Sequence, residues 1–205
     1  MTGLLVDGPR KAPLTVILAH GAGAPMDSPF MAAMARGLAA HGHRVVRFEF
    51  PYMAARRSGR RPPPDRESVL LDAWRRTIAH SGPVRDHVIG GKSMGGRMAS
   101  LVADELGVRG LLCLGFPFHA PGKPPGARID HLARLATPTL IVQGTRDPMG
   151  SVEDAAGYRL SPRVRIAWIE GGDHSLEPLR RSGRTTGETW AEAIAAAHRF
   201  LARLA

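Results

Sequence analysis

The 205-residue chain has very little cysteine, few aromatic residues and no long hydrophobic run. Its single cysteine, Cys113, excludes an intramolecular disulfide and a zinc site built from several cysteines. The nine histidines show no spacing typical of a metal site, and nucleotide-binding loops of the P-loop or G-x-G-x-x-G type are absent. We therefore expect a protein of the reducing cytoplasm with neither a metal nor a cofactor.

No apolar run approaches the roughly 20 residues that cross a bilayer, so we expect no membrane association. The start of the chain superficially resembles a signal peptide, because Arg10 and Lys11 precede an apolar run and residues 22–24 resemble a cleavage site. That run covers only residues 14–19 and ends at His20, which is too short for a signal peptide.

The formal net charge is +10, and arginines cluster in residues 56–61 and 180–184. A basic surface of this kind can bind nucleic acid, but aromatic residues make up only 5% of the chain and no nucleic-acid-binding motif is present. We interpret the charge as a solvated basic surface and expect no specific nucleic-acid partner. The sequence leaves the oligomeric state open.

Apolar strand patterns alternate with helical patterns along the whole chain. This alternation predicts an α/β fold with a mostly parallel central sheet and helices on both faces, in one domain over residues 1–205. We expect an arginine- and proline-rich exposed loop at 53–65. The expected strands cover 14–19, 44–50, 88–90, 110–116, 139–143 and 164–169, and the expected helices cover 28–42, 66–81, 94–107, 129–135, 152–160 and a stretch at the carboxyl end.

Residues 91–95, Gly-Lys-Ser-Met-Gly, fit the G-x-S-x-G pattern of a nucleophile elbow. In such an elbow, a tight turn between a strand and a helix exposes a serine hydroxyl, and flanking glycines avoid clashes with nearby backbone. The pattern also fits a serine that merely caps a helix after a strand. Ser93 is therefore a candidate nucleophile whose role depends on what the other strand ends supply.

Asp147 and His174 follow two later strands, so Ser93, Asp147 and His174 all lie beyond the carboxyl ends of strands, where open parallel sheets bind ligands. A serine hydroxyl needs a neutral imidazole to accept its proton, and a carboxylate holds that imidazole in the required tautomer. Taken singly, Asp147 also fits a turn before Pro148, and His174 also fits an exposed loop. Their joint placement and their order favour a catalytic triad.

An oxyanion hole needs backbone amides that face the charge developing on the substrate. We predict the amide of Met94, directly after the serine, and that of Ala22, in the glycine-rich loop 20–24 after the first long strand. A plain glycine turn is the alternative interpretation of this loop.

Other polar residues are weaker candidates for the same roles. Cys113 lies in the middle of a leucine-rich strand and fits an inert core position. His20 precedes the glycines and fits a structural role in the loop, while Asp173 is too close to His174 in sequence to orient it. Further weak candidates for the acid are Asp27, Glu153 and Asp154.

On these motifs the chain resembles the α/β-hydrolases, a superfamily of enzymes with a Ser-His-Asp triad. It is similar to a lidless branch that includes testis-expressed protein 30 and the hydrolase-like domain of an NSL chromatin-complex subunit, and more distantly to dienelactone hydrolases, whose cysteine nucleophile is a serine here. The matching stretches are residues 20–24, 90–97, 115–123, 143–147 and 170–174. The resemblance implies the α/β-hydrolase fold without a lid domain and the triad, but it implies no substrate.

Two functional classes follow from these patterns. The first is a serine hydrolase, carboxylesterase-like, that cleaves a small soluble ester or thioester through an acyl-enzyme. The second is a non-catalytic interaction module on the same fold. The short connection over residues 119–137 leaves no room for a lid. The cationic residues Lys92, Lys123 and Arg146 near strand ends suggest an anionic substrate. Candidate residues of the substrate pocket are Phe118, His119, Lys123, Arg146 and Met149.

Overall fold

A computed structural model describes residues 3–123 and 126–205. Its centre is one sheet of seven strands in the order β1-β3-β2-β4-β5-β6-β7, and every pair of neighbours is parallel except β1 and β3. The prediction of a mostly parallel sheet is therefore confirmed. The strands are β1 (Leu5–Asp7), β2 (Thr15–Ala19), β3 (Arg44–Phe48), β4 (His87–Lys92), β5 (Gly110–Leu114), β6 (Thr139–Gly144) and β7 (Val164–Ile169).

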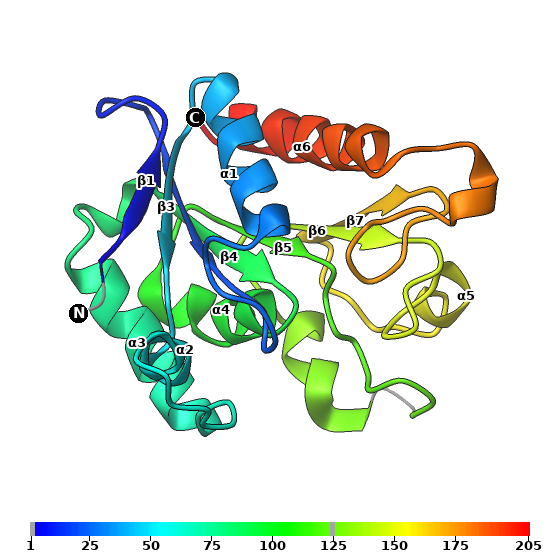
Figure 1. The fold of residues 1–205 in the computed structure, drawn as a ribbon, viewed down its shortest axis with the longest axis horizontal. Coiled ribbons are helices and arrows are strands. Elements are labelled where there is room, and N and C mark those ends of the chain that lie inside the picture. Colours follow the sequence, from blue (N-terminus) through cyan, green and yellow to red (C-terminus); the bar gives the residue numbers. More distant parts are fainter. Residues whose placement is uncertain (1–2, 124–125) are drawn as a thin grey trace.

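Helices cover both faces of the sheet (Figure 1), as predicted. One face carries α1 and α6, and the other carries α3 and α4. The α-helices are α1 (Pro29–Ala40), α2 (Pro51–Arg57), α3 (Glu67–Ala79), α4 (Met94–Leu106), α5 (Val152–Ala155) and α6 (Thr186–Ala202), and the 3₁₀ helices are η1 (Val84–Asp86), η2 (Gly126–Ala133) and η3 (Arg180–Ser182).

Each face of the sheet has its own hydrophobic core, because side chains of a strand point alternately to its two sides. Along β2, Ile17 packs on the α3–α4 side, whereas Val16 and Leu18 pack on the α1–α6 side. All three side chains are completely buried. Burial on both faces explains why the central strands are continuous apolar runs rather than alternating ones.

Several expected bounds were wrong. The strands expected at 44–50 and 110–116 end at Phe48 and Leu114, and the helix expected at 129–135 is the 3₁₀ helix η2. Residues 53–57 belong to α2 and not to a loop, since Pro51 begins a helix at its first position and Tyr52 and Met53 are buried beneath it. Helix α5 ends at Ala155 instead of continuing to Leu160, because the chain turns at Gly157 and Tyr158 stacks on Phe118.

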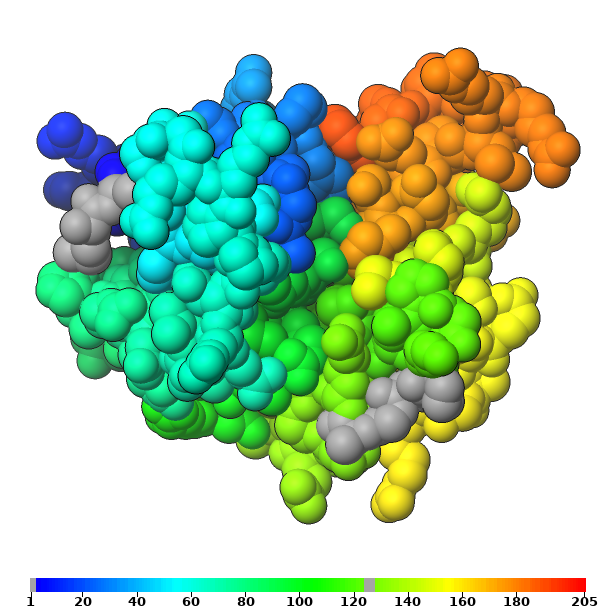
Figure 2. Space-filling view, turned by 60° about the horizontal axis from the view of Figure 1, so that its bottom comes forward, coloured from blue at the N-terminus to red at the C-terminus, as the bar shows by residue number. Residues whose placement is uncertain are grey.

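The sheet brings distant segments of the chain together at one edge. The segments that follow the carboxyl ends of β2, β4, β6 and β7 carry the predicted oxyanion loop and the three residues of the predicted triad. Figure 2 shows early (blue), middle (green) and late (orange) segments bordering one another on a single face of the molecule. The connection between β5 and β6 includes η2, and Pro124 and Pro125 within it lie outside the described residues.

Candidate active site

Ser93 lies at a sharp turn between β4 and α4, and its backbone has φ 49° and ψ −117°. A non-glycine residue rarely adopts this conformation, which the surrounding packing must maintain. The flanking glycines allow that packing: a Cβ at Gly91 would lie 2.1 Å from the carbonyl oxygen of Ala19, and one at Gly95 would lie 2.6 Å from that of His20. The turn therefore presses directly against the end of β2.

The hydroxyl of Ser93 points at the imidazole of His174, with 2.8 Å between Oγ and Nε2. On its other side, Nδ1 of His174 lies 2.8 Å from Oδ2 of Asp147. An ionised carboxylate can only accept, so Nδ1 carries the hydrogen and Nε2 is left to accept the proton of the serine. The structure thus places the three residues in one continuous chain of hydrogen bonds.

Asp147 is completely buried, and hydrogen bonds satisfy both of its carboxylate oxygens. Oδ1 accepts from the backbone N–H of Met149 at 2.8 Å, and Oδ2 accepts from the amide nitrogen of Gln143 at 2.7 Å as well as from His174. A buried charge is tolerated when its oxygens are hydrogen-bonded in this way. The carboxylate is therefore fixed in place before any substrate arrives.

Asp173, the residue before His174, closes the loop that carries His174. Oδ1 of Asp173 accepts from the backbone N–H groups of Ser175 and Glu177 at 2.7 and 3.0 Å. The indole N–H of Trp190 on α6 also donates to the carbonyl of Ser175. Asp173 therefore shapes the loop and does not contact the imidazole, which agrees with its rejection as the acid of the triad.

The loop after β2 lies beside Ser93, because a Cβ at Gly21 would be 3.6 Å from the Cβ of Ser93. His20 is buried, and Nε2 accepts from the N–H of Phe50 at 3.1 Å while Nδ1 donates to the carbonyl of Gly21 at 2.6 Å. Burial lowers the pKa of His20, so the ring stays neutral. The sequence-based assignment of a structural role to His20 fits these contacts.

The two predicted oxyanion donors come from different segments. Met94 directly follows Ser93, and Ala22 belongs to the loop after β2. Within the described residues, neither the amide of Ala22 nor that of Met94 donates a hydrogen bond. Tyr52 of α2 fixes the first segment, since its hydroxyl lies 3.2 Å from the carbonyl of Gly21 and 3.0 Å from that of Ala22. The carbonyls of this loop are thereby turned toward Tyr52.

The five predicted pocket residues are placed very differently. Phe118 has no exposed surface and stacks on Tyr158, so it belongs to the core. His119 is also buried and lies 3.2 Å from a carboxylate oxygen of Asp154. Lys123 is exposed. Arg146 is exposed too, and its guanidinium donates to the carbonyl of Gly171. Met149 is half-buried and directly contacts Asp147 through its N–H.

A second serine–histidine pair occurs in the protein, but its hydrogen bond runs in the opposite direction from that between Ser93 and His174. Ser100 lies on α4 with its Oγ 2.8 Å from Nε2 of His131, but the hydroxyl hydrogen is donated to the carbonyl of Arg97. Nε2 of His131 must then be the donor, so this ring cannot take a proton from Ser100. Complete burial also raises the pKa of the Cys113 thiol, which agrees with the interpretation of Cys113 as a core residue.

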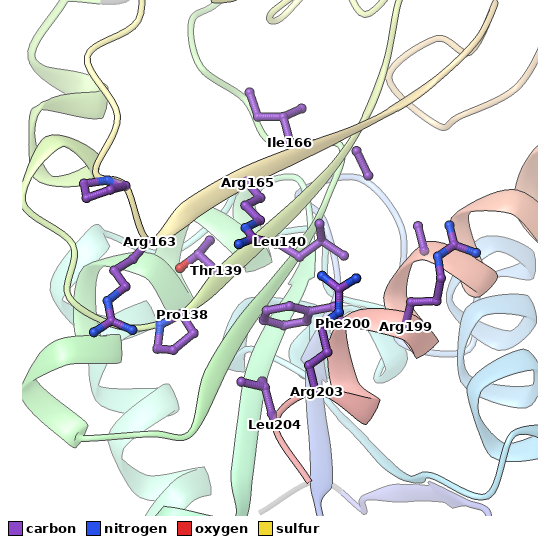
Figure 3. Close-up of a pocket in the computed structure, with 13 residues that line it drawn as sticks. Pro138, Thr139, Leu140, Arg163, Arg165, Ile166, Arg199, Phe200, Arg203 and Leu204 are labelled. Carbon is purple, nitrogen blue, oxygen red and sulfur yellow. The ribbon is translucent and has the colours of Figure 1, made fainter.

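An open hollow of about 360 Å³ lies at the opposite end of the sheet (Figure 3), lined by the first residues of β6 and β7 and by the end of α6. Its arginines are Arg163, Arg165, Arg199 and Arg203. It contains none of the predicted site residues. Among the described residues, no three His, Cys, Asp or Glu side chains are grouped to hold a metal ion, and no helix has the length and apolarity to cross a membrane.

Sequence reasoning missed two residues that support this site. Gln143 is the last residue but one of the buried strand β6, where its polarity was a usable signal, and it is completely buried against Asp147. Nothing in the sequence indicated a role for Tyr52 in the site, because it lies beside a segment that we expected to be a loop. Its contact with the loop after β2 depends on α2, which only the structure shows.

Comparisons with known proteins agree with the fold described above. A family model described as an alpha/beta hydrolase domain matches residues 12–202. An alpha-beta serine hydrolase homologue from Coxiella burnetii is 21% identical, with a TM-score of 0.73, and the match covers 97% of this chain and 90% of that one. A Xanthomonas campestris serine hydrolase without a lid has 19% identity, a TM-score of 0.70 and coverages of 98% and 88%. Dienelactone hydrolase from Anabaena variabilis has 19% identity, a TM-score of 0.72 and coverages of 98% and 90%.

Proposed function

Because this chain belongs to the alpha/beta hydrolase domain family and has its fold, we propose that it is a serine hydrolase. The reaction is cleavage of a small soluble carboxylic ester or thioester through an acyl-enzyme. The observation that carries the proposal is the hydrogen-bonded chain from Ser93 through His174 to Asp147. The similar structures support the fold, while the chemistry rests on these three side chains.

In the first step, Ser93 Oγ attacks the carbonyl carbon of the substrate while Nε2 of His174 takes the hydroxyl proton. Asp147 stabilises the imidazolium through Nδ1. The amides of Ala22 and Met94 donate to the oxyanion, each worth roughly 3 kcal/mol to the transition state. Collapse of the tetrahedral intermediate breaks the bond to the leaving group, which takes the proton from Nε2.

In the second step, water attacks the acyl-enzyme and His174 acts as general base again. The proton of the water passes to Nε2 and then to the Ser93 oxygen as the acid product leaves. No cofactor takes part. We further propose that the protein acts in the cytoplasm, as its single, buried cysteine suggests. The narrower similarity to testis-expressed protein 30 and to the NSL subunit stays a prediction.

The substrate should be small and soluble, because the connection over residues 119–137 is too short to form a lid over the site. Met149 is the best placed of the pocket candidates, since its backbone contacts Asp147. Lys123 and Arg146 are exposed and can attract an anionic substrate, although Arg146 already donates to a backbone carbonyl. Phe118 is not available to the substrate in this structure, because the core surrounds it.

The test is hydrolysis of a panel of acetate, butyrate and octanoate esters, with matched thioesters and amides. We expect the wild type to cleave the short esters and Ser93→Ala to cleave none. Ser100→Ala is the matched control, because it removes the hydroxyl of the other serine–histidine pair and should retain activity. A folded wild type that cleaves no member of the panel, or equal rates for wild type and Ser93→Ala, would overturn the proposal.

A further inference from the structure

Lys92, the residue directly before Ser93, reaches across the sheet edge to the loop of His174. Its ammonium nitrogen Nζ donates a hydrogen bond to the backbone carbonyl of His174. The same nitrogen lies 5.5 Å from the centre of the Phe30 ring, at the start of α1. One side chain thus links the serine turn, the histidine loop and α1.

Gly115, just after β5, leaves the space in which this contact forms. Its backbone has φ 64°, a conformation that favours glycine. A Cβ at this position would lie 2.9 Å from Nζ of Lys92 and 2.4 Å from the carbonyl oxygen of His174. A side chain at residue 115 would therefore collide with both partners of the hydrogen bond.

The ammonium has an energetic cost in this environment. Burial lowers the pKa of Lys92 to about 8, whereas the carboxylates of Asp147 and Asp173 act in the opposite direction. The groups that face Nζ from α1 and from the segment after β5 are Phe30 and Gly115, which carry no charge. The fold therefore tolerates a charged group that a neutral side chain of similar length would replace at lower cost.

We propose that Lys92 is a positioning residue, whose charged hydrogen bond to the His174 carbonyl holds the imidazole between Ser93 and Asp147. This inference rests on the proposed function of the same site. A charged donor forms a stronger hydrogen bond than a neutral amine. Loss of the proton from Lys92 therefore loosens the histidine loop and slows the reaction without altering any atom that contacts the substrate.

Activity and stability then respond to alkaline pH in opposite directions. The unfolded chain keeps the lysine proton up to about pH 10.5, while the folded protein releases it near pH 8. Between these values the unfolded state binds more protons, so the Lys92 contribution to folding stability rises with pH. Activity falls over the same interval. Partial unfolding cannot produce that combination.

The experiment compares wild type, Lys92→Met, Lys92→Arg and the control Lys11→Met, which changes an exposed lysine near the start of the chain. For each we measure kcat and KM on a short ester from pH 6.5 to 9.5, the thermal midpoint, and hydrogen exchange of the peptide containing residues 173–177. The wild-type kcat should decline as pH rises through about 8. Lys11→Met should match the wild type throughout.

Lys92→Met should lower kcat roughly tenfold at pH 7, with KM within about twofold and no alkaline decline. Its thermal midpoint should equal or exceed that of the wild type, and its histidine loop should exchange faster. Lys92→Arg keeps the charge, so it should recover part of kcat and remove the decline.

A wild-type kcat that stays constant from pH 7 to 9.5 would overturn the proposal, whether or not the variants fold. So would wild-type kinetics in Lys92→Met, or a loss of kcat matched by a lower thermal midpoint and an unchanged alkaline decline. Failure of the proposed function is a separate result, because Ser93→Ala would then be as active as the wild type.

Discussion

The side-chain amide of Gln143 donates a 2.7 Å hydrogen bond to Oδ2 of Asp147, the same oxygen that accepts from His174. Gln143 also accepts from the N–H of Phe116 and donates to the carbonyls of Phe116 and Gly150. A single buried amide thus joins the end of β6, the segment after β5 and the acid of the proposed triad. Its orientation fixes which carboxylate oxygen faces the imidazole.

Replacing Gln143 by Met should therefore affect stability and activity together. Methionine has a similar volume but lacks the amide oxygen that accepts from Phe116 and the amide N–H groups that donate to Asp147. The N–H of Phe116 is then left buried without its acceptor. We expect a loss of about 1–3 kcal/mol in the free energy of unfolding, measured by urea denaturation. A misplaced Asp147 should lower kcat on the order of 10- to 100-fold with little change in KM. Wild-type kcat in the folded variant would contradict this role.

Tyr52→Phe tests whether the loop after β2 shapes an oxyanion hole. Loss of the hydroxyl removes the hydrogen bonds to the carbonyls of Gly21 and Ala22. We expect about 1 kcal/mol less stability. A less well-directed Ala22 amide should reduce kcat roughly three- to tenfold, as steady-state kinetics would show.

The chain's other tyrosine is the matched control for that variant. The hydroxyl of Tyr158 is buried and has no hydrogen-bond partner among the described residues. Tyr158→Phe should therefore leave kcat unchanged and leave stability unchanged or slightly higher. Equal losses of kcat in the two variants would show that the loop contacts of Tyr52 are not what matters.

The pH dependence of stability provides a test at the acid side. Burial lowers the pKa of His131 from 6.5 to about 4, with the neighbouring charge of Arg97 acting in the same direction. Unfolded histidine takes up a proton near pH 6.5, so the unfolded state binds more protons between pH 6.5 and 4 and stability falls as pH decreases. The urea midpoint should decline over this interval.

His131→Gln should make that decline shallower, because the substituted side chain does not titrate. His80→Gln, at an exposed position, is the control and should keep the wild-type slope. If both variants follow the wild-type curve, the acid sensitivity originates in other buried histidines, such as His20 and His87, whose pKa values burial also lowers.

The sequence predicted most of the sheet because burial on both faces demands continuous apolar strands. It missed β1, because this strand has only three residues and shows no periodic pattern. Leu5, its first residue, follows Leu4, which is exposed. It also missed α2, because the arginines and prolines of residues 56–64 favour an exposed loop. Only two residues of the helix, Tyr52 and Met53, are buried.

Positions of the site residues were predictable where chain order and strand ends constrain them, as for Ser93, Asp147 and His174. Contacts formed across the fold were not. The ring stacking that buries Phe118 depends on Tyr158, and the hydrogen bond of Lys92 depends on the space at Gly115. Neither relation follows from local spacing, because each partner lies on a different strand end or loop.

The central claim is that Ser93 is an activated nucleophile, and covalent labelling tests it most directly. The folded protein is treated with a fluorophosphonate, and its intact mass and peptide masses are determined for wild type, Ser93→Ala and Ser100→Ala. We predict one adduct per chain on the peptide that contains Ser93, retained in Ser100→Ala and absent from Ser93→Ala. An unlabelled wild type, or an adduct that persists in Ser93→Ala, would contradict the account.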